Sequence, residues 1–191
     1  MPRARPLLLA LLLGACATTP PRQSAEPWSA PSLDLCSGVT VSNPPAADGN
    51  SRVLAYTPFT ALRNIVLARA PAAGCISSAF GPRRGGAGAF HDGLDLFTGA
   101  PTPVFAGGDG RIAAAGNQRG YGLTVEIDHG RGVSTRYAHL SELAPGVREG
   151  APIRGGMTVG RSGRSGNATA VHLHYEIRVD GRPVDPLKAG D

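Results

Sequence analysis

The sequence has no apolar run long enough for a membrane span and no cluster of basic residues, and each absence excludes a class of protein. The apolar stretch from Leu7 to Leu13 is too short to cross a bilayer as a helix. The net charge is +5, and without Arg3 and Arg5 the chain carries 17 basic and 14 acidic residues. All but one of the basic residues are arginines, and they are scattered without interleaved aromatic residues. This pattern gives no indication of a nucleic-acid partner.

Cysteine is scarce, and the first of the three cysteines follows an N-terminal export signal. Residues 1–15 have a basic start, an apolar stretch and small residues, which is typical of a signal peptide. Cys16 directly after Leu13-Gly14-Ala15 resembles the processing box of bacterial lipoproteins, in which the cysteine is lipidated and becomes the new N-terminus. We therefore expect a membrane anchor through a lipid on Cys16; the alternative is an ordinary signal peptide with an incidental cysteine.

Large apolar residues are rare in residues 16–50, which are rich in proline, alanine, serine and threonine. Such a composition buries too little apolar surface to fold alone, so we predict a flexible tether. Cys36 lies inside it, and once Cys16 carries lipid, Cys36 and Cys75 are the remaining thiols. Disulfides persist outside the cytoplasm, so a Cys36–Cys75 bond would join the tether to the start of the domain.

Residues 51–74 form a segment before the domain, and their pattern permits two structures. Thr57-Pro58 can start a helix, and Leu62, Ile65, Val66 and Arg69 follow at helical spacing. The alternative is a loop or strand on the surface of the domain.

Residues 75–191 lack any long helical period, and glycine separates their short apolar runs. Four runs are expected to be strands: 104–106, 110–114, 123–127 and 133–140. We therefore predict a mostly β domain, with an antiparallel sheet that forms a groove or a small barrel.

Histidine is also scarce, and two of the five histidines alternate with apolar residues in His172-Leu173-His174-Tyr175-Glu176. Alternate residues of a strand share a face, so His172, His174 and Glu176 should point away from the core. Imidazole is the commonest metal ligand, although such a pair can also be two surface or hydrogen-bonded histidines.

A second cluster, His91-Asp92-Gly93-Leu94-Asp95, adds an imidazole and a carboxylate four residues apart. In an extended segment His91, Gly93 and Asp95 share a face, and Gly93 would leave room for an ion between the two ligands. A helix would also align them, but Gly93 and the glycine-rich stretch before the cluster argue against one.

Beyond these two clusters, further short motifs follow one another in a specific order, and together they resemble the LytM and lysostaphin type of zinc metallopeptidases. The motifs run from Ser78 to Pro186 and comprise Ser78-Ala79-Phe80-Gly81-Pro82-Arg83, His91-x-Gly93-x-Asp95, Thr102-Pro103-Val104, Gly120-Tyr121-Gly122, Asp128-His129-Gly130, Tyr137-Ala138-His139-Leu140-Ser141, Gly163-x-x-Gly166, His172-x-His174-x-Glu176 and Val184-Asp185-Pro186. One departure is Val171, where the family often has proline.

The resemblance implies an antiparallel β-sheet groove, one zinc ion per chain and cleavage of peptide bonds in bacterial peptidoglycan. Carried over residue by residue, His91, Asp95 and His174 correspond to the zinc ligands, and His139 and His172 to the catalytic histidines. Two imidazoles and one carboxylate leave an open position for water, as catalytic zinc sites do.

Two residues near these motifs have other interpretations. Glu176 can orient a ligand or form a salt bridge at the strand edge. His129 lies at a predicted strand end and is assigned to a turn rather than to the site.

Two other functions are compatible with parts of the pattern. One is a non-catalytic regulator of cell-wall amidases, which this family provides when zinc ligands are lost; here every ligand position is filled. The other is a metal-binding β-barrel such as a cupin, which usually places its ligands in a different order.

The residue after Cys16 bears on location and substrate. Ala17 resembles the outer-membrane sorting class of Gram-negative lipoproteins. We therefore expect a periplasm-facing protein anchored to the outer membrane, which cleaves the D-alanyl to meso-diaminopimelyl cross-link and has a cell-wall amidase as a possible partner.

Overall fold

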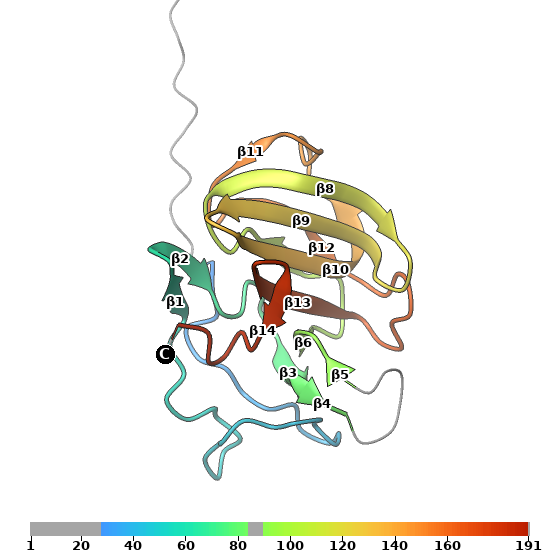
Figure 1. Cartoon of the computed structure of the whole chain (residues 1–191). Helices are drawn as coiled ribbons and strands as arrows, with labels where there is room; N and C mark the ends of the chain where they lie inside the picture. The colour runs from blue at the N-terminus through green and yellow to red at the C-terminus, as the bar shows by residue number, and fades with distance from the viewer. Residues whose placement is uncertain (1–27, 84–89, 191) are drawn as a thin grey trace, which may run out of the picture.

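A computed structural model of the chain describes residues 28–83 and 90–190. The described residues form fourteen strands and no helix (Figure 1). Their bounds are β1 Phe59–Leu62, β2 Ile65–Ala68, β3 Cys75–Ser78, β4 Gly81–Pro82, β5 Phe90–His91, β6 Leu94–Phe97, β7 Pro103–Phe105, β8 Gly110–Gln118, β9 Gly122–Gly130, β10 Val133–Leu143, β11 Pro152–Ile153, β12 Thr158–Ser162, β13 His172–Val179 and β14 Arg182–Val184. The prediction of a mostly β domain is confirmed.

One ten-stranded sheet carries most of the domain. Its main path runs β11-β8-β9-β10-β13-β6-β3, while β12 pairs with β10 and β7, and β14 pairs with β13. Every pair of these strands is antiparallel, as expected for a chain whose strands are joined by short glycine-containing turns. The expected strands all occur, and β8 to β10 extend beyond their predicted ends.

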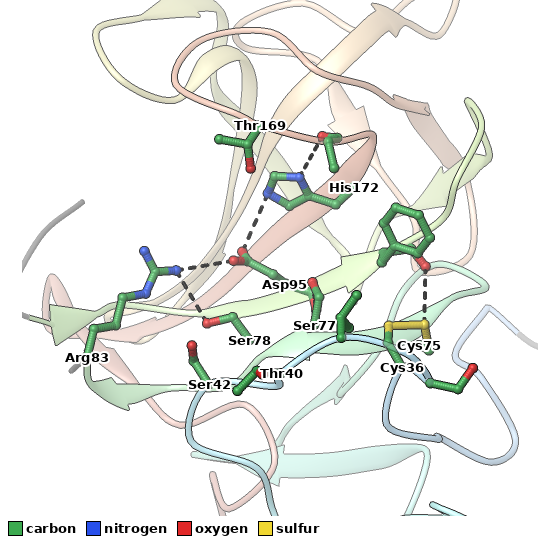
Figure 2. Close-up of a pocket in the computed structure, with 14 residues that line it drawn as sticks. Cys36, Thr40, Ser42, Cys75, Ser77, Ser78, Arg83, Asp95, Thr169 and His172 are labelled. Atoms are coloured by element: carbon green, nitrogen blue, oxygen red, sulfur yellow. Dashed lines mark hydrogen bonds and ion pairs between the residues drawn. A yellow bond between two sulfur atoms is a disulfide. The ribbon is translucent and has the colours of Figure 1, made fainter. Parts of the chain in front are cut away.

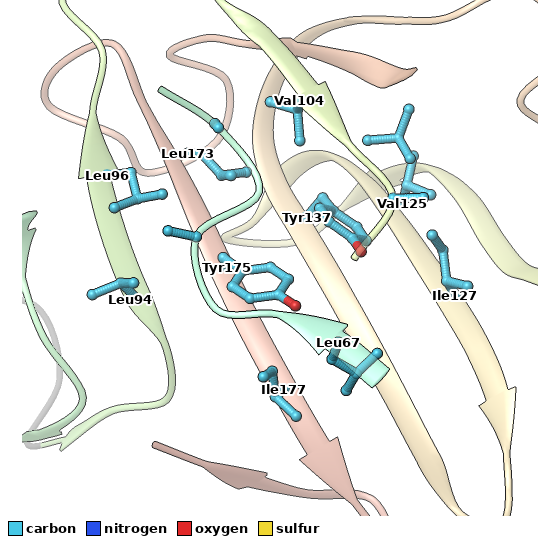
Figure 3. Packing of buried hydrophobic residues seen from close by; sticks show 14 of the residues in the cluster. Leu67, Leu94, Leu96, Val104, Val125, Ile127, Tyr137, Leu173, Tyr175 and Ile177 are labelled. Carbon is cyan, nitrogen blue, oxygen red and sulfur yellow. The ribbon is translucent and has the colours of Figure 1, made fainter. Parts of the chain in front are cut away.

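The core lies on the face of β13 that carries Leu173, Tyr175 and Ile177, which pack among side chains of neighbouring strands (Figure 3). Leu173, Tyr175 and Ile177 are fully buried, as the alternation along this strand predicts. Two buried tyrosines satisfy their hydroxyl groups there: the Gly107 amide donates to Tyr137 over 2.6 Å, and Tyr175 donates to the Ala68 carbonyl over 2.8 Å. These hydrogen bonds make the burial of two phenols compatible with an apolar core.

The segment before the domain contains a β-hairpin. The predicted helix in residues 51–74 is therefore wrong, and the alternative of a strand is confirmed. β1 and β2 pair from Phe59↔Ala68 to Leu62↔Ile65, which leaves Arg63-Asn64 as a two-residue turn. Both turn residues have positive φ, 50° and 64°, the backbone of a type I′ turn that favours hairpins. Pairing across this turn outweighs the helical spacing of the apolar residues.

Residues 28–50 lie on the domain instead of running as a tether. Leu33 is 1% exposed, Trp28 stacks edge-on with Phe59 over 4.7 Å, and Cys36 forms the predicted disulfide with Cys75. Few large residues and one covalent bond therefore suffice to order this segment against a surface that the domain provides. The predicted signal, Cys16 and the first part of the tether lie outside the described residues. Within the described ranges, no helix has the length and apolarity needed to cross a membrane.

Candidate metal centre

Antiparallel pairing of β6 with β13 brings the two sequence clusters together. Asp95 and His174 are direct partners in the register, and His91 lies on β5, three residues before β6 begins. The exposed fractions of His91, Asp95 and His174 are only 3%, 8% and 6%. Three residues that lie up to 83 positions apart in the sequence therefore share one buried point on the sheet.

The distances inside this triad fit one metal ion. His91 Nε2 and His174 Nδ1 are 3.1 Å apart, and they lie 3.1 and 2.8 Å from the same Asp95 oxygen, Oδ1. All three candidate ligand atoms are thus near enough to contact one cation. Together they form a metal-binding triad of two imidazoles and one carboxylate, a donor set that suits zinc and leaves a coordination position open.

Hydrogen bonds at the outer ring nitrogens set the tautomers of both histidines. His91 Nδ1 donates to the Ala79 carbonyl over 2.9 Å, because a carbonyl oxygen can only accept. His174 Nε2 lies 3.1 Å from the Glu176 carboxylate. In neutral rings the lone pairs of the inner nitrogens then point at Asp95, and such a group of electron pairs needs a positive charge between them.

The charges around the triad point the same way. Burial opposes ionisation of Asp95, but its close contacts with the His174 and His91 rings hold the pKa of its carboxyl well below the usual range. Burial likewise disfavours charged His174, but Asp95 and Glu176 on either side raise the pKa of its imidazole to about 9. Without a cation the site therefore holds a proton, which a metal ion would displace on binding.

Arg83 contacts the second oxygen of the aspartate. Its guanidinium lies 3.2 Å from Asp95 Oδ2, so Oδ1 is the oxygen that faces the histidines. The sequence contained Arg83 only as part of a longer motif, and its role as a partner of Asp95 was missed. Contact between the two depends on how β3, β4 and β6 are placed, which no local pattern reveals.

Glu176 supports His174 and also forms salt bridges, so both interpretations of this residue hold. Its side chain is fully buried and meets Arg136 at 3.2 Å and Arg178 at 2.6 Å. Burial alone would raise the pKa of Glu176, yet the contacts with His174 and the arginines lower it to about 2. The Arg136 guanidinium also lies over the Tyr121 ring, 4.4 Å from its centre. The ionised carboxylate thus fixes the orientation of His174.

Replacing Glu176 with glutamine should therefore weaken metal binding without removing it. Loss of the carboxylate partner of a metal-binding histidine costs about 10–100-fold in metal affinity. Competition with a chromophoric chelator measures this change directly. The Glu126→Gln variant is a matched control, because Glu126 also contacts Arg136 but does not contact His174. Equal affinities of the Glu176→Gln variant and the wild type would show that the carboxylate acts only in salt bridges.

The glycine of the His91 cluster has a different role from the one predicted. A Cβ on Gly93 would lie 2.4 Å from the Tyr175 carbonyl and 3.0 Å from the His174 ring. Glycine therefore allows the backbone before β6 to approach β13, and it does not create space for an ion between His91 and Asp95. The two ligands lie on separate strands joined by a bend, not on one extended strand.

His139 and His172 face each other beside the triad, with ring centres 4.8 Å apart. His139 Nδ1 donates to the Ser165 carbonyl over 2.8 Å, and His172 Nδ1 donates to the Ala170 carbonyl over 2.9 Å. Each neutral ring therefore keeps an unprotonated Nε2, and that of His172 lies 3.8 Å from Asp95. Burial and the nearby His172 lower the pKa of His139 to about 4, so His139 is neutral near pH 7.

A local irregularity of β10 positions His139. The pairing register between β10 and β9 shifts between Tyr137 and Leu140, and His139 has a φ of 60°. A non-glycine residue in this conformation is uncommon and is often found at functional sites. His129 is elsewhere: its ring nitrogens contact the Asp109 carbonyl at 2.7 Å and the Thr135 hydroxyl at 2.8 Å. These contacts agree with its assignment outside the site.

The four histidines and Asp95 line one cleft of about 410 Å³. The other residues that line this cleft are Arg83, Phe90, Asp92, Gly120, Tyr121, Asn167, Ala168 and Thr169. A buried metal-binding triad thus opens on a cleft beside two further imidazoles. That arrangement can activate a water molecule and act on a polarised carbonyl group.

Comparison with known proteins agrees with this geometry. Residues 89–186, more than half of the chain, match Peptidase family M23. The chain is 43% identical over 97 residues to the DD-carboxypeptidase/endopeptidase Mpg of Neisseria meningitidis. The aligned stretch covers 51% of this chain and 22% of Mpg. It is 42% identical over 118 residues to the peptidoglycan DD-endopeptidase ShyA of Vibrio cholerae. This aligned stretch covers 60% of this chain and 27% of ShyA.

The fold is also similar to solved structures. A zinc-containing peptidase from Vibrio cholerae superposes with a TM-score of 0.57 at 29% sequence identity, over 70% of this chain and 40% of the other. The chain spans only about a quarter of the length of the two curated relatives. The similarity therefore covers one domain of larger proteins.

Proposed function

The chain belongs to peptidase family M23, and on that basis we propose that it is a zinc-dependent endopeptidase that hydrolyses peptide cross-links in bacterial peptidoglycan. The observation that carries the proposal is the complete triad of His91, Asp95 and His174, with its tautomers set, beside two further histidines. The printed names of Mpg and ShyA support the choice of endopeptidase chemistry on peptidoglycan.

In this proposal, each part of the site has a chemical role. His91 Nε2, Asp95 Oδ1 and His174 Nδ1 would hold the zinc ion. When bound, zinc acts as a Lewis acid that lowers the pKa of a water molecule to about 7 and polarises the scissile carbonyl. Either His139 or His172 would accept a proton from the attacking water at its unprotonated Nε2 and could then deliver that proton to the leaving amine. The other ring would stabilise the developing oxyanion only with a proton on its own Nε2.

The hydrogen bonds to backbone carbonyls keep both catalytic rings in place. Because Ser165 and Ala170 hold the Nδ1 protons, each ring presents Nε2 to the cleft without a change of tautomer. A low pKa keeps the His139 ring neutral near pH 7, with its Nε2 lone pair free to accept a hydrogen bond. These features favour catalysis over metal storage.

The location in the proposal rests on the N-terminal sequence. A lipid on Cys16 would anchor the protein to the outer membrane, facing the periplasm, where thin and directly cross-linked peptidoglycan is the substrate. We propose the D-alanyl to meso-diaminopimelyl bond as the bond cleaved. The "DD-endopeptidase" in the name of ShyA supports this choice.

Digestion of purified sacculi tests the proposal. The mature protein should convert cross-linked muropeptide dimers to monomers, and a chelator should stop this conversion, as chromatography with mass spectrometry would show. Zinc added back should restore it. If the dimers persist while an added cell-wall amidase becomes more active, the protein is a regulator of amidases and not an endopeptidase.

A further inference from the structure

A second pocket, of about 500 Å³, adjoins the metal cleft. The two hollows share Arg83, Asp95, Thr169 and His172, so the second continues the first past the His172 ring. Figure 2 shows Thr169 and His172 on one side of this pocket and Thr40 and Ser42 on the other. Arg83 lies at one end, and the disulfide lies at the other. A molecule that occupies the metal cleft can therefore extend into this pocket.

The outer wall of the pocket is the segment 36–42, which is attached at both ends to the edge strand β3. At its start, the Cys36 amide donates to the Ile76 carbonyl over 3.0 Å, and Cys36 is bonded to Cys75. At its end, the Ala79 amide donates to the Ser42 carbonyl over 2.9 Å. Between these points the segment leaves the sheet as a turn. A loop fixed at two points forms a stable wall rather than a loose cover.

The lining of this pocket suits an extended peptide. It presents hydroxyl groups from five serines and threonines besides Ser78 (Ser37, Thr40, Ser42, Ser77 and Thr169), and the apolar side chains of Val39 and Phe97. These two are 59% and 40% exposed, which is unusual for large apolar groups and typical of a binding surface. Among the described residues that line the pocket, Asp95 of the triad is the only carboxylate. The lining thus favours a peptide that is neutral or anionic.

The wall lies outside the residues that match the family model. The family match begins at residue 89, whereas residues 36–42 and the disulfide precede it. A segment that composition predicted to be a tether therefore supplies part of the cleft.

We propose that this pocket is a substrate subsite, in which residues 36–42 bind one peptide limb of the cross-link next to the scissile bond. The inference rests on the proposed function, because it takes the cross-linked peptide as the ligand. One limb lies between the 36–42 wall and Thr169, and the other lies in the metal cleft near Tyr121 and Asn167. The Cys36–Cys75 bond fixes the start of the wall to β3.

The Val39→Trp variant tests the subsite, because the larger tryptophan side chain should fill the pocket that Val39 lines. Val39 is not a member of the metal-binding triad. The variant should raise KM for a purified muropeptide dimer about tenfold and change kcat little, because the loss concerns substrate binding. Zinc content and the melting temperature should match those of the wild type. Leu54→Trp is the matched control, since Leu54 is 54% exposed in the same part of the chain and does not line the pocket.

A second measurement separates the subsite from the catalytic proposal. Titration with the disaccharide tetrapeptide monomer should shift the NMR signals of residues 36–42 in the wild type and in Leu54→Trp. In Val39→Trp the same shifts should need about tenfold more ligand. If the protein cleaves dimers and Val39→Trp has an unchanged KM, the subsite proposal is wrong and the endopeptidase proposal is retained. If the protein cleaves no dimer but the monomer shifts these signals, the endopeptidase proposal is wrong and peptide binding in this pocket is retained. The absence of any such shift in the wild type overturns the subsite.

The disulfide gives an independent variant. Replacing Cys36 and Cys75 together with serine frees the start of the wall and should also raise KM, while the triad keeps its zinc. An unchanged KM in this double variant, with the fold intact, would show that the bond does not support the subsite.

Discussion

Replacing His174 with alanine should remove the bound zinc and lower kcat/KM for cross-linked muropeptides by about a thousandfold or more. His174 supplies one of three ligand atoms, and the remaining pair, His91 and Asp95, cannot hold the ion tightly. His174 also lies between two carboxylates, Asp95 and Glu176, so its loss removes one hydrogen-bond partner from each of them. Metal analysis of the purified variant, with about one zinc per chain in the wild type, measures the effect.

A matched histidine variant serves as the control for this test. His129→Gln removes an imidazole that contacts Asp109 and Thr135 and no member of the triad, so its zinc content should equal that of the wild type. His91→Ala and Asp95→Ala should behave as His174→Ala does. A stoichiometric zinc content in His174→Ala would contradict the assignment of the triad as the zinc site.

Substitution of His139 or His172 should separate catalysis from metal binding. Both variants should keep about one zinc per chain, whereas kcat should fall by about 10²–10⁴-fold, the usual contribution of a general acid or base. Neither imidazole has a ring nitrogen in the group of atoms that converges on the metal position. Steady-state kinetics on muropeptide dimers, together with metal analysis, distinguishes these variants from those of the triad.

The backbone of His139 decides which substitution to use there. Its φ of 60° is unfavourable for alanine, while asparagine tolerates this conformation well. His139→Asn therefore removes the base with little strain, and His172→Ala serves at the other position, where the strand is regular. Turnover close to that of the wild type in both variants would remove these histidines from the mechanism.

The strand β13 shows what the local sequence can predict. Alternation from His172 to Ile177 predicted which side chains face the core, because a strand reverses side with each residue whatever its neighbours are. The segment at residues 59–68 shows the limit. Its apolar residues fit a helix or a hairpin, and the choice depends on Arg63-Asn64, whose left-handed turn becomes favourable only when the two strands pair and pack.

By itself, the sequence determined the mostly β class, the two faces of the histidine strand and the set of groups available for chemistry. These follow from residue type and from spacings of a few residues. Only the tertiary structure decided that Asp95 stands opposite His174, that Gly93 admits the Tyr175 carbonyl, and that residues 36–42 line a pocket beside the metal cleft. Register, close backbone approach and the packing of distant segments depend on groups far apart in the chain, so no local pattern contains them.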